Sequence, residues 1–126
     1  MKTPLALLLL LMAVAPISTL AGQQAVLHSP AARVLCDRRM CANEGGISVA
    51  LTRQYLGKKA AIRLGSQGDF DRSEFTFGNG VFCDVKQRLC RADRYYGADG
   101  QRSASVNEKY TEQLFGHPAG TPPSSR

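Results

Sequence analysis

Four cysteines form two close pairs that could be joined by disulfide bonds. In an oxidising compartment such pairs predict two bridges. We favour local pairing, because each pair brackets a short polar segment flanked by β-forming residues, which places the two cysteines across a tight hairpin turn. Each bridge would contribute roughly 2–2.5 kcal/mol by restricting the unfolded chain. The favoured bridges are Cys36–Cys41 and Cys83–Cys90.

Two alternatives for these cysteines stay open at this stage. Equivalent cysteines could pair between the two halves of the chain and join them at a pseudo-twofold axis. A zinc site is a weaker interpretation, because the cysteine spacings are longer than those of a zinc knuckle and the histidines, His28 and His117, lie near the ends. We therefore predict disulfides, with no metal and no cofactor.

The carboxylates offer a second kind of chemistry, either acid–base catalysis or calcium binding. Asp37 and Asp84 each follow the first cysteine of a pair, and two carboxylates held close together could work as acid and base. We prefer a turn-capping role, because aspartate readily accepts hydrogen bonds from backbone N–H groups two residues further on. Asp69, Asp71 and Glu74 cluster oxygen atoms but lack the spacing of an EF-hand loop. A small hydrolase or a calcium-binding protein using Asp37, Asp84, Asp69 and Asp71 is the alternative function.

Two threonines at matched positions, Thr52 and Thr111, are the remaining candidates for a nucleophile. A hydroxyl nucleophile needs a base to take its proton, and no histidine or lysine stands at a fixed spacing from both threonines. The glycines at 45–46 and 78–80 lack the pattern of a phosphate-binding loop and predict turns. We therefore expect no catalytic set and no enzyme.

The segment with the strongest binding character contains Tyr95 and Tyr96, which follow Arg91 and Arg94. Aromatic rings beside guanidinium groups in a polar loop suit stacking and contact with anions. One tyrosine could instead cover the edge of neighbouring strands. Basic residues also gather at both cysteine hairpins, and if the two hairpins pack side by side they form one cationic face. These residues are Arg33, Arg38 and Arg39 in the first hairpin and Lys86, Arg88, Arg91 and Arg94 in the second.

An internal duplication positions all of these residues. The run Val34-Leu35-Cys36-Asp37 recurs as Val81-Phe82-Cys83-Asp84, and each copy closes with a threonine-to-glycine segment. We place the copies at residues 33–57 and 80–116, with longer loops in the second copy. All four cysteines fall within the duplicated element, so the repeat is also the covalent framework.

The pattern predicts an α+β fold, a small disulfide-stapled domain of two related hairpin-plus-helix units. In the first unit, residues 33–35 begin a strand and residues 43–46 form a turn. Ser48 then caps a helix through Leu56, which Gly57 ends in left-handed conformation. A further helical turn or two is expected over residues 58–64, with Ala61 and Leu64 facing inward.

The second unit is richer in strand signals and predicts a short antiparallel β-meander followed by a helix. The first turn of the meander contains Asn79 and Gly80, a pair that tolerates positive φ. The segment 105–108 has the form of a capping box, so the helix should begin there with Val106 on its buried face and end at Gly116. The expected strands are 75–77, 81–83 and 88–91, and the buried residues of the meander include Phe75, Phe77, Phe82 and Leu89.

The first residues predict export from the cytoplasm. Lys2 gives a positive n-region, residues 5–14 form an apolar h-region, and small residues at 19–21 offer a signal-peptidase site. The apolar run is shorter than the about 20 residues of a membrane span. We therefore expect a cleaved signal peptide and no membrane anchor. The expected division is a signal peptide at 1–21, an extended lead-in at 22–32, a single domain at 33–116 and a disordered tail at 117–126.

The charge of the chain narrows the class of partner. The net charge is +6, and without the leader 15 basic residues face 10 acidic ones. In the periplasm, anionic partners include lipid headgroups, lipopolysaccharide phosphates, cell-wall carboxylates and acidic proteins. We expect no nucleic acid partner, because export removes the protein from the cytoplasm. A positive charge that only keeps the protein soluble is the plainer alternative.

One set of motifs runs through nearly all of the expected domain. It comprises Gly45-Gly46-Ile47-Ser48, Tyr55-Leu56-Gly57, Phe75 to Asp84, Arg88 to Tyr96 and Leu114-Phe115-Gly116. With these motifs the chain resembles the Fels prophage protein-like family, the small secreted YcgJ-like proteins of enteric and related bacteria. The resemblance implies a bacterial origin and an envelope location, and it assigns no active site. We expect a periplasmic, non-enzymatic protein whose cationic face and Tyr95-Tyr96 loop hold an acidic protein or an anionic envelope component.

Overall fold

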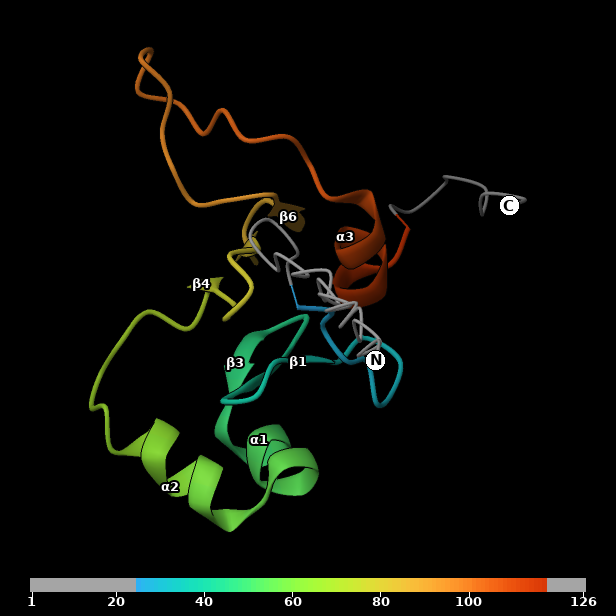
Figure 1. Ribbon diagram of the computed structural model, residues 1–126, viewed down its shortest axis with the longest axis vertical. Helices are drawn as coiled ribbons and strands as arrows, with labels where there is room; N and C mark the ends of the chain where they lie inside the picture. The colour runs from blue at the N-terminus through green and yellow to red at the C-terminus, as the bar shows by residue number, and fades with distance from the viewer. Residues whose placement is uncertain (1–24, 118–126) are drawn as a thin grey trace, which may run out of the picture.

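Each cysteine hairpin is part of a three-stranded antiparallel sheet, and helices follow both sheets (Figure 1). This is the α+β architecture that the sequence predicts. The computed structural model describes residues 25–117, so the predicted signal peptide, the start of the lead-in and residues 118–126 of the predicted tail lie outside the described residues. The elements are β1 (Leu35–Cys36), β2 (Cys41–Asn43), β3 (Gly46–Ser48), α1 (Val49–Leu56), α2 (Lys58–Gly65), β4 (Glu74–Thr76), β5 (Phe82–Asp84), β6 (Leu89–Arg91) and α3 (Glu108–Phe115).

Both disulfides join directly opposed residues of neighbouring strands. Cys36 on β1 lies opposite Cys41 on β2, and Cys83 on β5 lies opposite Cys90 on β6. The paired Cα atoms are 4.1 and 4.0 Å apart, and both bonds are formed. The predicted local pairing is therefore confirmed, and no cysteine remains for pairing between the halves or for zinc.

The first sheet contains a strand where the sequence analysis expected a turn and a helix cap. β3 pairs with β2 so that Gly46 lies opposite Asn43. Gly46 has a φ of +111°, and a Cβ added there would lie 2.1 Å from the carbonyl oxygen of Arg72. The amide of Ile47 donates to the same oxygen at 2.9 Å. A strand this short, with a glycine required at its start, carries no alternating pattern from which it could be predicted.

The two helices of the first half begin and end close to the predicted residues. The Ser48 side chain accepts a hydrogen bond from the amide of Leu51 at 3.1 Å, as an N-cap does. Gly57 separates α1 from α2 with φ 97° and ψ 170°, so its φ is positive but its conformation is not the left-handed helical one expected. The buried residues of α2 are Ala61 and Leu64, as predicted.

None of the helices among residues 25–117 has the length and apolar character of a membrane span.

The β-meander of the second half is confirmed in the order β4-β5-β6. At its first turn the amide of Gly80 donates to the carbonyl of Phe77, and the positive φ falls on Gly80 rather than on Asn79. The Asn79 side chain accepts from the amide of Val81 at 3.0 Å and donates to the carbonyl of Ala25 at 2.9 Å. Of the residues expected inside, Phe75, Phe77 and Phe82 are buried and Leu89 is partly exposed.

α3 begins later than the sequence analysis expected. Its N-cap is Asn107, whose side chain accepts from the amide of Tyr110 at 3.0 Å. The prediction of a capping box at 105–108 was wrong, because Val106 forms a β-bridge with Arg91 instead of entering the helix. Val106 is accordingly 40% exposed rather than buried. Tyr110 and Leu114 lie in the core, and Gly116 ends the helix, as predicted.

In each half, a threonine hydroxyl accepts a hydrogen bond from the backbone amide of the second cysteine of the disulfide. The Thr52 hydroxyl oxygen accepts from the amide of Cys41 at 2.9 Å, and that of Thr111 accepts from the amide of Cys90 at 2.8 Å. The two threonines considered as nucleophiles therefore each satisfy the backbone of a cystine. The predicted duplication of residues 33–57 and 80–116 itself stays a prediction.

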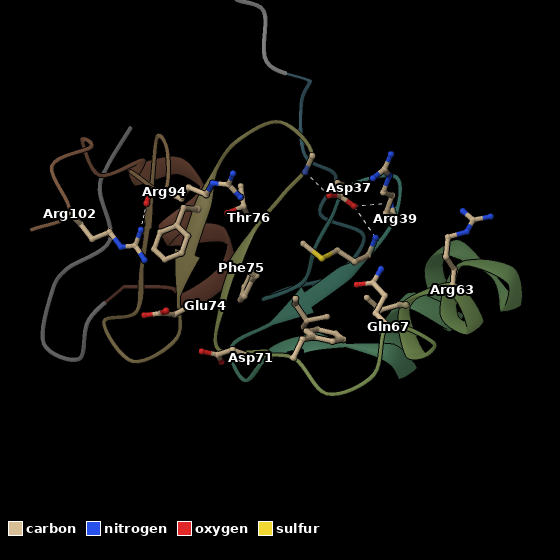
Figure 2. Close-up of a pocket in the computed structure, with 16 residues that line it drawn as sticks. Asp37, Arg39, Arg63, Gln67, Asp71, Glu74, Phe75, Thr76, Arg94 and Arg102 are labelled. Atoms are coloured by element: carbon tan, nitrogen blue, oxygen red, sulfur yellow. Dashed lines mark hydrogen bonds between the residues drawn. The ribbon is translucent and has the colours of Figure 1, made fainter. Parts of the chain in front are cut away.

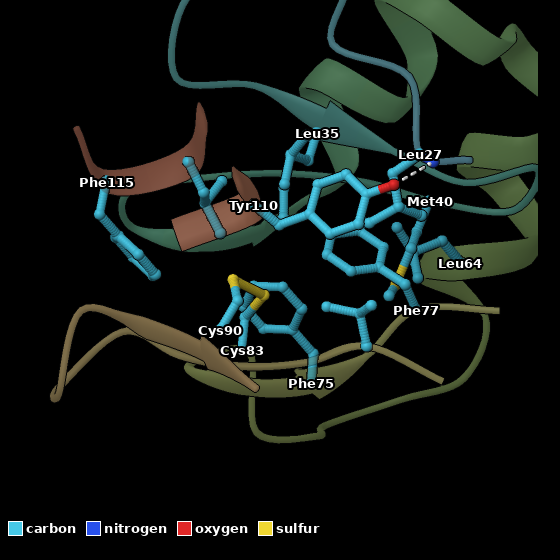
Figure 3. Packing of buried hydrophobic residues seen from close by; sticks show 13 residues of the cluster. Leu27, Leu35, Met40, Leu64, Phe75, Phe77, Cys83, Cys90, Tyr110 and Phe115 are labelled. Carbon is cyan, nitrogen blue, oxygen red and sulfur yellow. Dashed lines mark hydrogen bonds between the residues drawn. A yellow bond between two sulfur atoms is a disulfide. The ribbon is translucent and has the colours of Figure 1, made fainter. Parts of the chain in front are cut away.

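One apolar cluster joins the two halves (Figure 3). Tyr110 of α3 lies at its centre, and its hydroxyl accepts from the amide of Leu27 in the lead-in at 3.1 Å. The Cys83–Cys90 disulfide lies beside the ring of Phe75 in the same cluster. Because both halves supply these residues, neither half covers its apolar face alone. The cluster includes Leu35, Met40, Ala42 and Leu64 from the first half and Phe75, Phe77, Val81, Leu114 and Phe115 from the second.

Replacing Thr52 by valine should lower the free energy of unfolding by roughly 2–3 kcal/mol, because the buried amide of Cys41 would lose its acceptor. Thr52 is fully buried, and its hydroxyl also donates to the carbonyl of Ser48 at 2.7 Å. The control is T52S, which keeps the hydroxyl and should cost only about 1 kcal/mol for the lost methyl group. Urea denaturation measures both, and equal losses would contradict the role of the hydroxyl.

Candidate functional site

A hollow of about 830 Å³ lies between the two halves (Figure 2). Residues distant in the sequence line it, from the first cysteine hairpin through α2 to the loop after β6. Its lining combines apolar side chains with charged groups of both signs. The apolar lining residues are Met40, Ile47, Leu64, Phe70, Phe75 and Phe82, and the charged ones are Arg39, Arg63, Arg94, Arg102, Asp37, Asp71 and Glu74.

Asp37 joins two turns at the edge of the hollow, because its carboxylate accepts hydrogen bonds from backbone amides of both turns. One carboxylate oxygen accepts from the amides of Arg39 at 2.7 Å and Met40 at 2.8 Å, which closes the turn of the first cysteine hairpin. The other accepts from the amide of Gly78 at 2.7 Å, in the turn between β4 and β5. Asp37 therefore caps a turn, as preferred from the sequence, and also connects the two halves, which the sequence did not predict.

Asp84 plays the same turn-capping part in the second hairpin. It is 8% exposed, and one oxygen accepts from the amides of Lys86 at 2.8 Å and Gln87 at 3.4 Å. Asp84 does not line the hollow that Asp37 lines. The hollow therefore does not bring the two carboxylates of the proposed acid–base pair together.

The arginines lie at the two ends of the hollow. Figure 2 shows Arg39 and Arg63 at one end and Arg94 and Arg102 at the other, with Phe75 between them. None of the four guanidinium groups makes an ion pair with a carboxylate among residues 25–117. The lining therefore offers four guanidinium groups that are not ion-paired within this region, beside the carboxylates of Asp37, Asp71 and Glu74.

Arg102 is fixed in place by aromatic stacking. Its guanidinium carbon lies 4.1 Å from the centroids of both the Phe82 and the Tyr96 rings. The side chain also donates to the carbonyl of Arg94. Phe82 is buried on β5, whereas Tyr96 is 62% exposed in the loop after β6. Arg102 therefore pins that loop against the sheet at the end of the hollow.

The binding residues predicted from the sequence occupy different environments. Arg94 lines the hollow and lies over Tyr95, which is 64% exposed. Arg91 does not line it, and its side chain donates to the carbonyl of Ala104 at 2.9 Å while its Nε is buried without a partner. The structure therefore gives Arg91 a role in holding the loop. Tyr96 stacks on Arg102.

The two adjacent arginines of the first hairpin, Arg38 and Arg39, line different cavities. Arg39 lines both the hollow and a neighbouring cavity of about 640 Å³ beside the lead-in, whereas Arg38 lines only the second. In the second hairpin Arg88 is paired with Glu44 at 3.2 Å. The first hairpin thus supplies Arg39 to the hollow, and the loop beyond the second hairpin supplies Arg94. Of the basic residues assigned to the conditional cationic face, only these two line the hollow, where Arg63 and Arg102 join them.

The acidic loop between α2 and β4 holds its own polar contacts. Hydrogen bonds from the hydroxyl and the amide of Ser73 lower the pKa of Asp71 below its ordinary value of 3.8. Because the pKa of Asp71 is lower in the folded state than in the unfolded chain, its ionisation stabilises the folded state at pH values above 3.8. This stabilisation is lost as the pH falls through the pKa of the folded state. Between residues 25 and 117, no three His, Cys, Asp or Glu side chains come together to hold a metal ion. The calcium alternative at Asp69 and Asp71 therefore has no assembled ligand set in this region.

Arg102 and Arg63 line the hollow but were not predicted from the sequence as members of the site. Tyr96 and Arg102 form a β-bridge around a turn in which the amide of Gly100 donates to the carbonyl of Gly97 at 3.0 Å. The Asp99-Gly100 pair is a hairpin signal that could have placed Tyr96 opposite Arg102. No local signal marks Arg63, because only the packing of α2 brings it to the hollow.

Comparison with known proteins places the chain in a family. Residues 27–115 match the family described as YcgJ protein, and the chain belongs to that family. One relative is the Uncharacterized protein YcgJ of Escherichia coli (strain K12), which is 58% identical over 89 residues. The matched region covers 71% of this chain and 73% of the relative. No solved structure matches the chain. The resemblance drawn from the sequence is confirmed.

Proposed function

We propose that this protein is an exported, non-enzymatic binding protein whose hollow holds an anionic partner. The observation that supports the proposal most is the arrangement of Arg39, Arg63 and Arg94, which line one hollow and are not ion-paired to a carboxylate among residues 25–117. Guanidinium groups bind carboxylates and phosphates through charge-assisted hydrogen bonds. The apolar lining adds surface that a partner can bury.

The expected compartment is the periplasm. The sequence of residues 1–21 has the organisation of a cleaved leader. Both cysteine pairs form disulfides, which persist in oxidising compartments and are rare in the cytosol. The net positive charge then favours partners that are anionic in the envelope.

The lining of the hollow favours an acidic protein segment among those partners. Cations at both ends suit two separated acidic groups, and the buried or half-buried rings of Phe75 and Phe70 suit an apolar side chain between them. A single small anion would contact only one end. We therefore infer that an extended acidic segment lies along the hollow and carries the specificity in its spacing of charges.

A titration with fluorescently labelled poly-glutamate tests the site. The variant R39A/R94A removes one cation from each end and should weaken binding roughly tenfold, with the remaining affinity less sensitive to salt. The matched control is R53A/K58A, which removes two cations that do not line the hollow and should leave the affinity unchanged. Equal weakening by the two variants would show that net charge alone attracts the peptide and would overturn the proposal.

A further inference from the structure

The segment from residue 45 to residue 68 carries cations and no acidic residue. It contains Arg53, Lys58, Lys59 and Arg63, and all ten acidic residues of the chain lie outside it. The segment forms α1 and α2, which lie together at one end of the molecule, opposite the loop that follows β6 (Figure 1). This segment therefore carries four positive charges and no negative one.

This helical pair carries a group of exposed residues, which we call the basic helical face. The face consists of Ala50, Arg53, Lys58, Lys59 and Ile62. Ala50 and Arg53 of α1 line the same shallow depression as Lys58 and Ile62 of α2. Ile62 is 60% exposed, although it is one of the larger apolar residues of the chain. The face thus combines cations with an apolar side chain that is largely exposed.

Stability of the helices does not account for the position of the lysines. Lys58 and Lys59 occupy the first turn of α2, where the helix dipole disfavours positive charge, and no acidic residue lies in that turn. None of the three cations of the face makes an ion pair within residues 25–117. Two lysines kept in an unfavourable position without ion-pair partners are suited to contact with an external anion.

We propose that the basic helical face docks on the surface of an anionic lipid bilayer. A bilayer presents a broad layer of phosphates, which matches cations spread over two short helices and needs no specific geometry. The exposed Ile62 would enter the boundary between headgroups and acyl chains, as apolar residues of interfacial helices do. This inference is separate from the ligand of the hollow, because Arg39 and Arg94 are not part of the face.

Sedimentation with lipid vesicles tests the proposal on the mature protein, residues 22–126, from which the predicted apolar leader has been removed. The protein should bind mixed phosphatidylglycerol–phosphatidylcholine vesicles and not phosphatidylcholine vesicles, and the binding should fall as salt is raised. The variant R53A/K58A should lower the partition coefficient roughly 25-fold, since each basic residue near the surface contributes about a fivefold effect. The variant R39A/R94A is the reciprocal control and should bind vesicles as the unchanged protein does.

A second variant separates a lipid surface from a soluble acidic partner. I62S should weaken vesicle binding several-fold and leave poly-glutamate binding unchanged, because only a bilayer offers an apolar layer to Ile62. Retained vesicle binding in R53A/K58A would overturn the proposal. So would an equal loss of poly-glutamate binding in that variant, because these cations would then attract any polyanion and not a lipid surface in particular.

Discussion

Replacement of Gly46 by alanine is expected to lower the free energy of unfolding by about 3–5 kcal/mol, one of the largest effects available to a single methyl group in this chain. Two costs combine at this position. The φ of +111° is unfavourable for any residue with a side chain, and the added Cβ would lie 2.1 Å from the carbonyl oxygen of Arg72. Relief would require moving the backbone of Arg72, whose carbonyl accepts the amide of Ile47.

The matched control for Gly46 is another glycine with positive φ and open space around it. Gly68 has a φ of +79°, and no atom lies within 4 Å of its ideal Cβ position. G68A should therefore cost only the conformational part, about 1–2 kcal/mol. Urea denaturation of both variants at equal m-values measures the difference. Similar losses for the two would mean that the approach of Arg72 to β3 is not a constraint on the fold.

Removal of the Cys83–Cys90 disulfide by alanine substitution is expected to destabilise the protein by about 3–5 kcal/mol. Both cysteines are fully buried in the cluster that joins the two halves. The loss therefore adds a cavity beside Phe75 to the greater freedom of the unfolded chain. For a domain whose total stability is of the order of 5–15 kcal/mol, such a loss would leave the folded state marginal at physiological temperature.

The Cys36–Cys41 disulfide provides the comparison for this prediction. It closes a loop of similar size, with a sequence separation of 5 rather than 7. The stabilisation that each bridge provides by restricting the unfolded chain is thus nearly equal, with a difference of about 0.3 kcal/mol. Cys36 and Cys41 belong to a smaller cluster with Val34, so C36A/C41A should cost about 2–3 kcal/mol. A larger loss for C36A/C41A than for C83A/C90A would contradict the assignment of the main core.

Features encoded within a few residues could be predicted from the sequence. Ser48 caps α1 because its side chain reaches an amide three residues ahead, and this geometry requires no information from the rest of the chain. The cystine pairs follow from short polar turns between β-forming residues for the same reason. The local α+β plan and both bridges were therefore accessible.

Features that depend on which segments meet could not be predicted. Ser105 has the sequence of a helix cap, but pairing of Val106 with Arg91 holds the chain extended until Asn107. The hollow is a stronger example, because residues from both halves line it and the amide of Gly78 in one half donates to Asp37 in the other. Arg91 and Arg94 looked equivalent in the sequence, and tertiary packing turned one toward Ala104 and left the other at the hollow.

The stacking of Arg102 has a consequence for the energetics of recognition. A free arginine loses much of its rotamer freedom when a ligand immobilises it, a cost of about 0.5–1.5 kcal/mol. Between the rings of Phe82 and Tyr96 that freedom is already spent during folding. The guanidinium of Arg102 is therefore preorganised, and an acidic segment bound as proposed would meet a rigid cation at that end of the hollow.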